Sequence, residues 1–166
     1  GRYGYQKFGV PISGAMDEFA LRAANLIVGN HQNDAVIEMT ALGATIETLQ
    51  NTWIAITGAD MSPELDGQPI ARWKPFDVAM GSILTFGNTQ NGMRTYMAVS
   101  GGIDVPLIMG SRSTDIKSGI GGLEGRELRI NDILYTLPTK LNSAPGNPAL
   151  PNIYELSNYG NHHKIR

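Results

Sequence analysis

Short β-type segments separated by turn residues make up most of this sequence and constrain its fold more than any other feature. They are rich in β-branched and aromatic residues, and they lie at Ala35–Thr40, Thr45–Leu49, Trp53–Thr57, Phe76–Met80, Ile83–Phe86, Met93–Val99, Leu128–Ile130 and Ile133–Leu137. Asp66-Gly67 predicts a tight hairpin, Gly81-Ser82 a second hairpin between its flanking segments, and Asn131-Asp132 a further tight turn. Strands about every ten residues, with one helix among them, predict a closed barrel or a sandwich.

One segment near the N-terminus has strong helical character. Asp17 is a favourable N-cap and Gly29-Asn30 a favourable end, so the pattern predicts a helix over Glu18–Val28. The apolar residues expected to share its inner face are Phe19, Ala23, Leu26 and Ile27, and the polar residues nearer the other face are Glu18, Arg22 and Asn25. The sequence therefore predicts a mostly β fold with one main α-helix.

A long glycine-rich stretch, Ser100–Arg126, follows the strand-forming part of the chain. It contains seven of the twenty glycines and a hydroxyl-rich run, Ser111–Asp115, which regular strands and helices do not accommodate for long. Its interspersed apolar residues are expected to tie it to a core: Ile103, Val105, Leu107, Ile108, Ile116, Ile120 and Leu123. We predict an ordered loop, longer than a connection needs and therefore functional.

Composition limits the possible partners and chemistry. The chain of 166 residues predicts one domain, over residues 1–137, and the proline-rich stretch at 138–166 predicts a linker and the start of a second domain that is missing here. Charged residues make up only 17%, against roughly 25% in typical soluble domains, which predicts a surface partly covered by another domain or chain. The net charge of −2, without a basic block, argues against nucleic acid.

Several classes of site find no support in the sequence. There is no cysteine, which fits a cytoplasmic protein, and no apolar run long enough to span a membrane. His31, His162 and His163 have no partner at metal-ligand spacing, so no metal site is expected, and His31 is interpreted as structural. A P-loop is absent, and the glycines at 119–125 match a dinucleotide fingerprint only superficially. The missing initial methionine indicates an N-terminus that lies outside this sequence.

Three groups of polar residues remain as candidates, each with a structural alternative. Glu38 lies in an apolar strand, either facing outward or as a buried acceptor. Arg94 and Tyr96 share a strand face, which either lines a barrel mouth or contacts solvent. The run Ser111, Arg112, Ser113, Thr114 and Asp115 offers hydroxyls and a guanidinium to a carboxylate or carbonyl ligand, or it binds only its own loop.

Long motifs resemble a known family. They read GRYGYQKFGVPISGAMDEFALRAANLIVGN, AVIEMT, TGADM, SGGIDVPLIMGSRSTD and GIGGLEGR, and the similarity runs from Gly1 to about Arg166. The chain resembles the N-terminal half of the biotin-dependent carboxyltransferase subdomain family, whose members include allophanate hydrolase subunit 2, Kip antagonist and the C subunit of 5-oxoprolinase, and which also covers part of urea carboxylase. The resemblance implies a cyclophilin-like β-barrel.

The resemblance also implies a function. The first expectation is an enzyme subunit, inactive on its own, of an ATP-dependent 5-oxoprolinase that opens the amide bond of 5-oxo-L-proline to give L-glutamate. Its expected partners are a protein like the Kip inhibitor or the B subunit of 5-oxoprolinase and a third, substrate-handling subunit, and the complex as a whole uses ATP. One alternative is the carboxyltransferase part of a urea carboxylase or allophanate hydrolase system, with biotin as cofactor. The alternative of another class is a regulatory binding module like a Kip antagonist, and prolyl isomerisation rests on analogy of fold alone.

Motif residues are carried over from the resemblance without individual roles. The substrate-binding candidates are Ser111, Arg112, Ser113, Thr114, Asp115, Gly121 and Gly122, with the two glycines expected opposite the hydroxyl run. Further candidates are Ser13, Asp17, Asn25, Glu38, Arg94 and Tyr96. We expect the glycines to let backbone N–H groups approach a ligand that carries a carboxylate or carbonyl oxygen.

Overall fold

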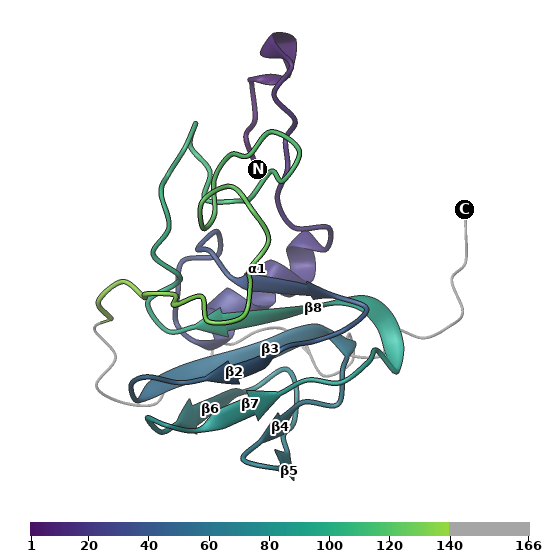
Figure 1. The fold of residues 1–166 in the computed structure, drawn as a ribbon, viewed down its shortest axis with the longest axis vertical. Coiled ribbons are helices and arrows are strands. Elements are labelled where there is room, and N and C mark those ends of the chain that lie inside the picture. Colours follow the sequence, from purple (N-terminus) through teal and green to yellow (C-terminus); the bar gives the residue numbers. More distant parts are fainter. Residues whose placement is uncertain (140–166) are drawn as a thin grey trace.

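Two antiparallel four-stranded sheets and one α-helix form the fold in the computed structural model, which describes residues 1–139 (Figure 1). The strands are β1 (Ile37–Thr40), β2 (Thr45–Glu47), β3 (Thr52–Asp60), β4 (Glu64–Leu65), β5 (Gln68–Pro69), β6 (Pro75–Val78), β7 (Ile83–Thr85) and β8 (Asn91–Val99). One sheet has the order β1-β8-β3-β6 and the other β2-β7-β4-β5. The mostly β prediction with one main helix is confirmed, although hydrogen bonds do not close the described strands into a continuous barrel.

Long strands β3 and β8 carry the core because their side chains alternate between two apolar layers. Ile54, Ile56 and Met97 pack between the sheets, with Val78 and Leu84 from the neighbouring strands. The intervening residues point to the opposite face, where Ala55, Tyr96 and Ala98 pack against the helix. Central strands with both faces buried read as continuous apolar runs, which is how β3 appears in the sequence.

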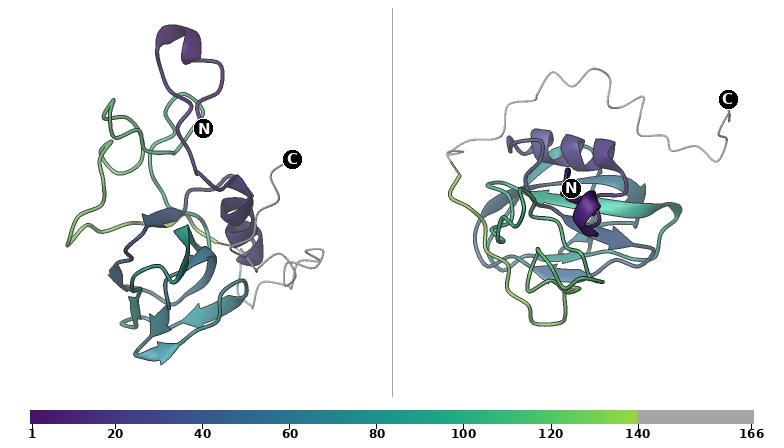
Figure 2. Two further views of the ribbon diagram at one scale, coloured as in Figure 1. Left: turned by 90° about the vertical axis from the view of Figure 1, so that its right-hand side faces the viewer. Right: turned by 90° about the horizontal axis from the view of Figure 1, so that it is seen from above.

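Helix α1 (Glu18–Ile27) lies across the outer face of the β1-β8-β3-β6 sheet (Figure 2, right). The predicted N-cap is confirmed, since the Asp17 carboxylate accepts the N–H of Ala20 at 2.9 Å. The predicted inner face of the helix was partly wrong, because only Ala23 and Ile27 of its four expected residues are buried. The buried helix residues are Ala20, Ala23, Ala24, Asn25 and Ile27. Phe19 is 46% exposed and reaches over the helix edge to Trp73, at 6.1 Å between ring centroids, while alanines fill three of the five buried helix positions.

Turn predictions located the turns better than the strands around them. Asp66 and Gly67 have positive φ and join β4 to β5, as the hairpin pattern predicts. The hairpin predicted around Gly81-Ser82 was wrong, because β6 pairs with β3 in one sheet and β7 with β2 and β4 in the other. The turn there moves the chain between sheets, so that apolar residues of both flanking strands reach the layer between them.

The strands predicted on both sides of Asn131-Asp132 were also wrong. A tight turn is present, with the N–H of Asp132 donating to the Arg129 carbonyl at 3.1 Å. The flanking residues form no ladder in the described structure beyond an isolated bridge between Ile103 and Thr136. Ile130 is 93% exposed, so no apolar layer holds this segment as a strand.

The loop over residues 100–126 forms turns and isolated bridges but no helix or strand, as predicted, and lies beside the first residues of the chain (Figures 1 and 2). Its early apolar residues, Ile103 and Val105, are buried, whereas Leu107 and Ile116 are mostly exposed. Most of the proline-rich segment, with His162 and His163, lies outside the described residues. Within the described part, no helix has the length and apolar character that crossing a membrane would require.

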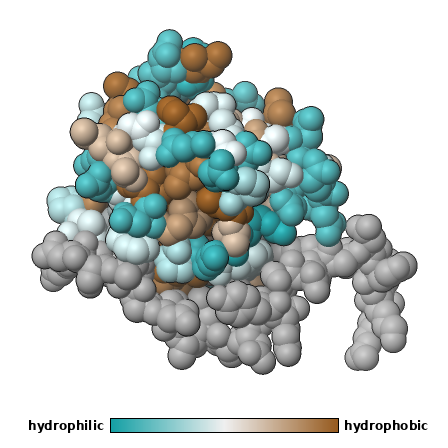
Figure 3. Space-filling view, turned by 90° about the horizontal axis from the view of Figure 1, so that it is seen from below, coloured by the Kyte–Doolittle hydropathy of each residue, from teal (hydrophilic) through white to brown (hydrophobic). Residues whose placement is uncertain are grey.

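The surface carries many large apolar side chains. On the face seen from below, hydrophobic residues gather in the middle and hydrophilic ones around them (Figure 3). Phe8, at 71% exposed, and Met16, at 70%, show that the N-terminal segment also presents apolar side chains to solvent. These side chains, like the low charge content, are typical of a surface that meets another domain or protein.

Candidate functional site

Two distant segments meet at the end of the molecule opposite β5 (Figure 1). One is the N-terminal arm, residues 1–16, which projects from the helix and contains a short 3-10 turn at Gln6–Phe8. The other is the loop that follows β8. Where they meet, two parts of the loop lie against each other, Ser113 and Thr114 on one side and Gly121 and Gly122 on the other, and we call this place the glycine crossing.

Glycine is required at both positions of the crossing. A Cβ atom on Gly121 would lie 2.2 Å from the Ser113 carbonyl oxygen, and one on Gly122 would lie 1.9 Å from the Thr114 hydroxyl. Both glycines have positive φ, 73° and 54°. The hydroxyl run and the two glycines therefore lie opposite each other, in the arrangement expected from the sequence. Their role as ligand contacts stays a prediction.

Side chains of the hydroxyl run bond mainly within the loop. The hydroxyls of Ser111 and Ser113 are 2.6 Å apart, and the Ser113 N–H donates to the Ser111 oxygen at 3.2 Å. Arg112 directs Nη1 to the Val105 carbonyl at 3.0 Å rather than into the crossing. The Gly122 N–H donates to the Arg112 carbonyl at 3.2 Å. The loop thus satisfies many of its own polar groups, which is the structural alternative considered for this run.

Arg2 completes the crossing and was missed by sequence reasoning. Its side chain is 0% exposed, and its Nη2 donates to the Ser113 carbonyl. The same nitrogen would lie 2.1 Å from a Cβ on Gly121, so the guanidinium rests directly on that glycine. Arg2 lies inside the first family motif, but nothing in its local pattern of glycine and tyrosine distinguishes a buried arginine from an exposed one.

Four of the other motif residues gather at the start of α1. The N–H of Asp17 donates to the Tyr96 hydroxyl at 2.8 Å. Glu38 accepts from the N–H of Met16 at 3.2 Å and from Arg94 Nε at 3.1 Å. Glu38 therefore faces outward but acts as an acceptor. Tyr96 is fully buried on the helix side of the sheet, so a solvent-facing position was wrong for it, and burial raises its pKa.

Asn25 and Ser13 lie away from both groups. Asn25 is fully buried and donates to the Asp34 carbonyl at 2.9 Å, while its own oxygen accepts from Asn30 at 3.0 Å. Asn30 in turn accepts the Gly101 N–H at 2.8 Å, which ties the end of the helix to the start of the long loop. Ser13 is half-buried in the arm, with a φ of 54°. We assign Asn25 a structural role.

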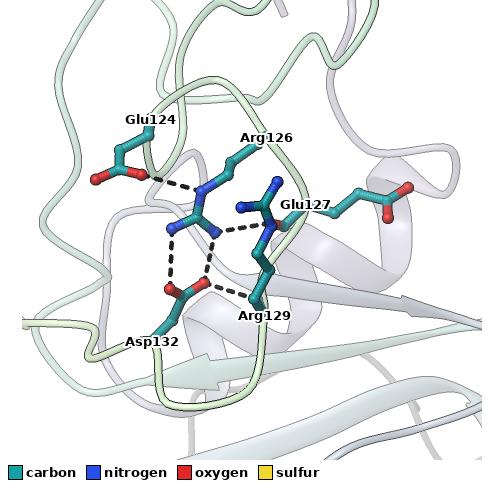
Figure 4. Close-up of polar contacts among 5 residues, drawn as sticks. All are labelled: Glu124, Arg126, Glu127, Arg129 and Asp132. Carbon is teal, nitrogen blue, oxygen red and sulfur yellow. Dashed lines mark hydrogen bonds and ion pairs between the residues drawn. The ribbon is translucent and has the colours of Figure 1, made fainter.

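Arg126 fixes the end of the loop (Figure 4). Its guanidinium donates two nearly parallel bonds to Asp132, at 2.7 and 2.9 Å, and a third to Glu124 at 3.0 Å. The N–H of Arg129 adds a bond of 2.7 Å to the same Asp132 carboxylate. These donors lower the pKa of Asp132 from 3.8 to about 2, while Asp132 and Glu124 raise the pKa of Arg126.

A separate cavity of about 470 Å³ lies next to the start of β3. Trp53, Asp77, Ser100 and Thr136 contribute to its lining, and none of them was a candidate from the sequence. The glycine crossing does not contribute to it. In residues 1–139, histidine, aspartate and glutamate nowhere form a group of three that could hold a metal ion.

Comparison with known proteins identifies relatives of two kinds. The C subunit of 5-oxoprolinase from Escherichia coli (strain K12) is 46% identical over 134 residues, which is 81% of this chain and 43% of that protein. Urea amidolyase of Saccharomyces cerevisiae is 45% identical over 135 residues, 81% of this chain and 7% of that protein. The crystal structure of Kluyveromyces lactis urea carboxylase superposes with a TM-score of 0.81 at 38% identity, covering 84% of this chain and 13% of that one.

The match extends over nearly the whole sequence but only part of each relative. The chain spans less than half the length of the curated relatives named here, 43% of one and 7% of the other. A family model described as the carboxyltransferase domain, subdomains A and B, matches residues 8–164. Together with the shared fold, that match shows that this chain belongs to the carboxyltransferase subdomain A and B family.

Proposed function

We propose that this chain acts within an ATP-dependent 5-oxoprolinase complex, as one of its subunits, and that the complex opens the amide bond of 5-oxo-L-proline to give L-glutamate. The observation that carries this proposal is the identity with the C subunit of 5-oxoprolinase, which extends over most of the described residues. A relative of the same name from Haemophilus influenzae supports it. The chain works with other subunits, because its relative is named as one part of an enzyme.

The proposed partners are a protein like the Kip inhibitor or the B subunit of 5-oxoprolinase and a third subunit that handles substrate. Exposed apolar side chains such as Phe8, Met16 and Ile130 supply surface for such contacts. The complex as a whole uses ATP in this proposal, and a P-loop of this sequence does not bind it, since the sequence contains none. We expect such a complex in the cytoplasm.

Within the chain we propose the glycine crossing as the substrate-binding region. Support comes from the buried guanidinium of Arg2 and from the loop glycines that bring backbone close to it. The cluster of Asp17, Glu38, Arg94 and Tyr96 holds the start of α1 on the sheet and has less to offer a ligand, because these groups bind one another or the backbone.

Reconstitution tests the proposed function. The full-length protein is purified with and without its neighbouring subunits, and ATP hydrolysis is measured with and without 5-oxoproline, together with glutamate release. We expect 5-oxoproline-dependent hydrolysis only when this protein is present. Equal activity of the partners without it would contradict the proposal.

A second candidate function is carboxyl transfer to urea. The identity with yeast urea amidolyase and the structural similarity to urea carboxylase support it. In that case ATP hydrolysis depends on urea, and avidin, which sequesters biotin, abolishes it. If the protein binds its partner but supports neither reaction, the function is that of a Kip-antagonist-like regulatory module.

A further inference from the structure

Arg2, at the glycine crossing, and Asp115, the residue after Thr114, are oppositely charged, and each has polar side-chain atoms without a hydrogen-bond partner among the described residues. Arg2 is fully buried and Asp115 is 7% exposed. Among the described residues, Arg2 Nε and Nη1 and Asp115 Oδ2 have no hydrogen-bond partner. Buried polar groups nearly always have a partner, and a buried charge without one is especially costly. Within residues 1–139, two nitrogen atoms of Arg2 and one oxygen atom of Asp115 therefore have no hydrogen-bond partner.

Both side chains belong to the same small region. Arg2 Nη2 rests on Gly121 and donates to the carbonyl of Ser113, which is two residues before Asp115. The backbone of Asp115 pairs with Ile120, the neighbour of Gly121, through bonds of 2.7 and 3.1 Å. Even so, the ion pairs found within residues 1–139 do not include one between Arg2 and Asp115. Both residues therefore adjoin the segment around Gly121, Arg2 through its side chain and Asp115 through the backbone of the neighbouring Ile120.

The unused atoms specify the chemistry of a ligand. A carbonyl oxygen accepts from the guanidinium, and an N–H group donates to the carboxylate oxygen. A ligand carboxylate satisfies Arg2 but is repelled by Asp115, and an ammonium group has the opposite problem. A neutral amide carries both a carbonyl oxygen and an N–H, so it matches the donors and the acceptor at once.

We propose that the glycine crossing binds the amide group of the substrate, with the carbonyl oxygen on Arg2 and the N–H on Asp115. This inference rests on the proposed function and narrows it, since urea and the lactam ring of 5-oxoproline both contain this group. One recognition element thus serves both of the candidate substrates. It also changes the expected ligand at the Ser111–Asp115 run from any carboxylate or carbonyl compound to an amide.

Binding requires the crossing to open. The unused atoms of Arg2 and Asp115 are closed to solvent in this structure. We expect the N-terminal arm to be the element that moves, because Phe8 at its tip is 71% exposed and the arm carries no buried apolar residue. Arg2 lies on the arm and Asp115 on the loop, so the arm has to move away to admit the amide and return to place the guanidinium on its carbonyl oxygen.

Direct binding to the full-length protein tests the amide site without ATP or partner proteins. The probes are urea, 2-pyrrolidinone, which has the lactam without the carboxylate, and cyclopentanecarboxylate, which has the carboxylate without the lactam. We expect calorimetry to detect urea and 2-pyrrolidinone but not cyclopentanecarboxylate. Binding of the carboxylate alone, or of none of the three, overturns the proposal.

Matched variants separate a ligand site from a structural ion pair. Arg2→Gln and Asp115→Asn are expected to weaken 2-pyrrolidinone binding about ten- to a hundredfold, the loss of one charge-assisted hydrogen bond. Arg22→Gln and Asp104→Asn make the same changes at exposed positions and should leave binding unchanged. Should Arg2→Gln fail to fold, Asp115→Asn decides. If the double variant regains stability that each single variant loses, and binding is unaffected throughout, the two residues only pair with each other and the proposal fails.

The reconstituted complex distinguishes this proposal from the proposed function. If Asp115→Asn raises the KM for 5-oxoproline about tenfold at unchanged fold, both stand. If the complex is active and its KM is unchanged in the folded variant, the amide site is wrong and the function stands. If the amides bind as expected but no complex hydrolyses 5-oxoproline, the site stands and the function is wrong.

Discussion

Two regions of the molecule differ in what stabilises each of them. One is the sheet core, formed by the two sheets and α1, and the other is the loop region, formed by residues 100–137 and the N-terminal arm. In the sheet core, fully buried apolar residues such as Ile54, Ile56 and Leu84 pack in layers, so stability is spread over many contacts. In the loop region, single close contacts dominate, as between Arg2, Ser113 and Gly121. The first region tolerates conservative changes of size, whereas the second depends on particular residues at particular positions.

The difference has a consequence for dynamics. The arm and the loop after Val105 bury few apolar side chains, and Ile116 and Ile130 are exposed. Regions with little apolar burial open at lower free energy than the core that supports them. A binding region that has to open for its ligand is therefore located where opening disturbs the core least.

We expect the largest loss of stability from a substitution in the sheet core. Replacing Ile56, which is 0% exposed between the sheets, with alanine removes buried methylene and methyl groups. We expect Ile56→Ala to lower the free energy of unfolding by about 2–5 kcal/mol, measured by urea titration with circular dichroism.

Ile130→Ala is the control, because the same side chain is 93% exposed in the loop region. Its expected change is within about 0.5 kcal/mol. A comparable loss for both variants would show that the loop region has a core of its own, and the two regions would then not differ in how they are held.

The next effect tests the close contacts of the loop region. Gly121→Ala introduces a Cβ 2.1 Å from Arg2 Nη2 and 2.2 Å from the Ser113 oxygen, at a φ of 73°. We expect a loss of about 2–4 kcal/mol, from the left-handed backbone and from the forced displacement together. Amide hydrogen exchange should show it first in the loop and the arm.

Gly110→Ala provides a matched control in the same loop. Gly110 has a φ of 74°, but a Cβ there would meet nothing within 4 Å. Its loss, about 1–2 kcal/mol, reports the backbone conformation alone. If Gly121→Ala costs no more than Gly110→Ala, the crossing is loose enough to accept a side chain.

The difference between local signals and long-range contacts explains which features of the fold could be predicted from the sequence. Strand alternation and the signals at Asp17 and Asp66-Gly67 are local, so the helix start and the hairpin were predicted correctly. Pairing of β6 and β7 with strands of different sheets depends on contacts far along the chain and was missed. The inner face of α1 was misplaced because the space above the sheet, which selects alanines over Phe19, has no local signature.

Contacts between residues far apart in the chain limited the prediction of the candidate site even more than that of the fold. The facing positions of the hydroxyl run and of Gly121 and Gly122 were anticipated from the family motifs. Arg2 was not, because its burial depends on Ser113, which is 111 positions away. Tyr96 was placed on the correct strand face, but which side of the sheet that face covers is decided by where the helix packs.

A smaller effect is expected at the start of α1. Asp17→Ala removes the carboxylate that accepts the Ala20 N–H, with an expected loss of about 0.5–2 kcal/mol in the free energy of unfolding. Asp17→Ser keeps a capping oxygen and should remain near the wild type. Since α1 packs on the sheet, this loss should appear in global unfolding. A loss confined to exchange of the first helical turn would mean that the helix start belongs with the loop region.

The smallest effect concerns the Arg126–Asp132 pair and acidic pH. The folded chain lowers the pKa of Asp132 from 3.8 to about 2, so its ionised form is favoured by folding. The contribution is complete above the ordinary value and disappears as pH falls through about 2. Because the pair is partly exposed and joins residues only six positions apart, we expect global unfolding to change little and the turn at residues 129–132 to loosen first. Asp132→Asn should show the loosened turn at neutral pH, and Arg126→Lys, which keeps the charge but loses the two parallel bonds, should show part of it. Amide exchange of this turn, followed between about pH 5 and pH 2 with these variants, gives the measurement. A turn that stays closed in Asp132→Asn would mean that apolar contacts hold this end of the loop, which would make it resemble the sheet core.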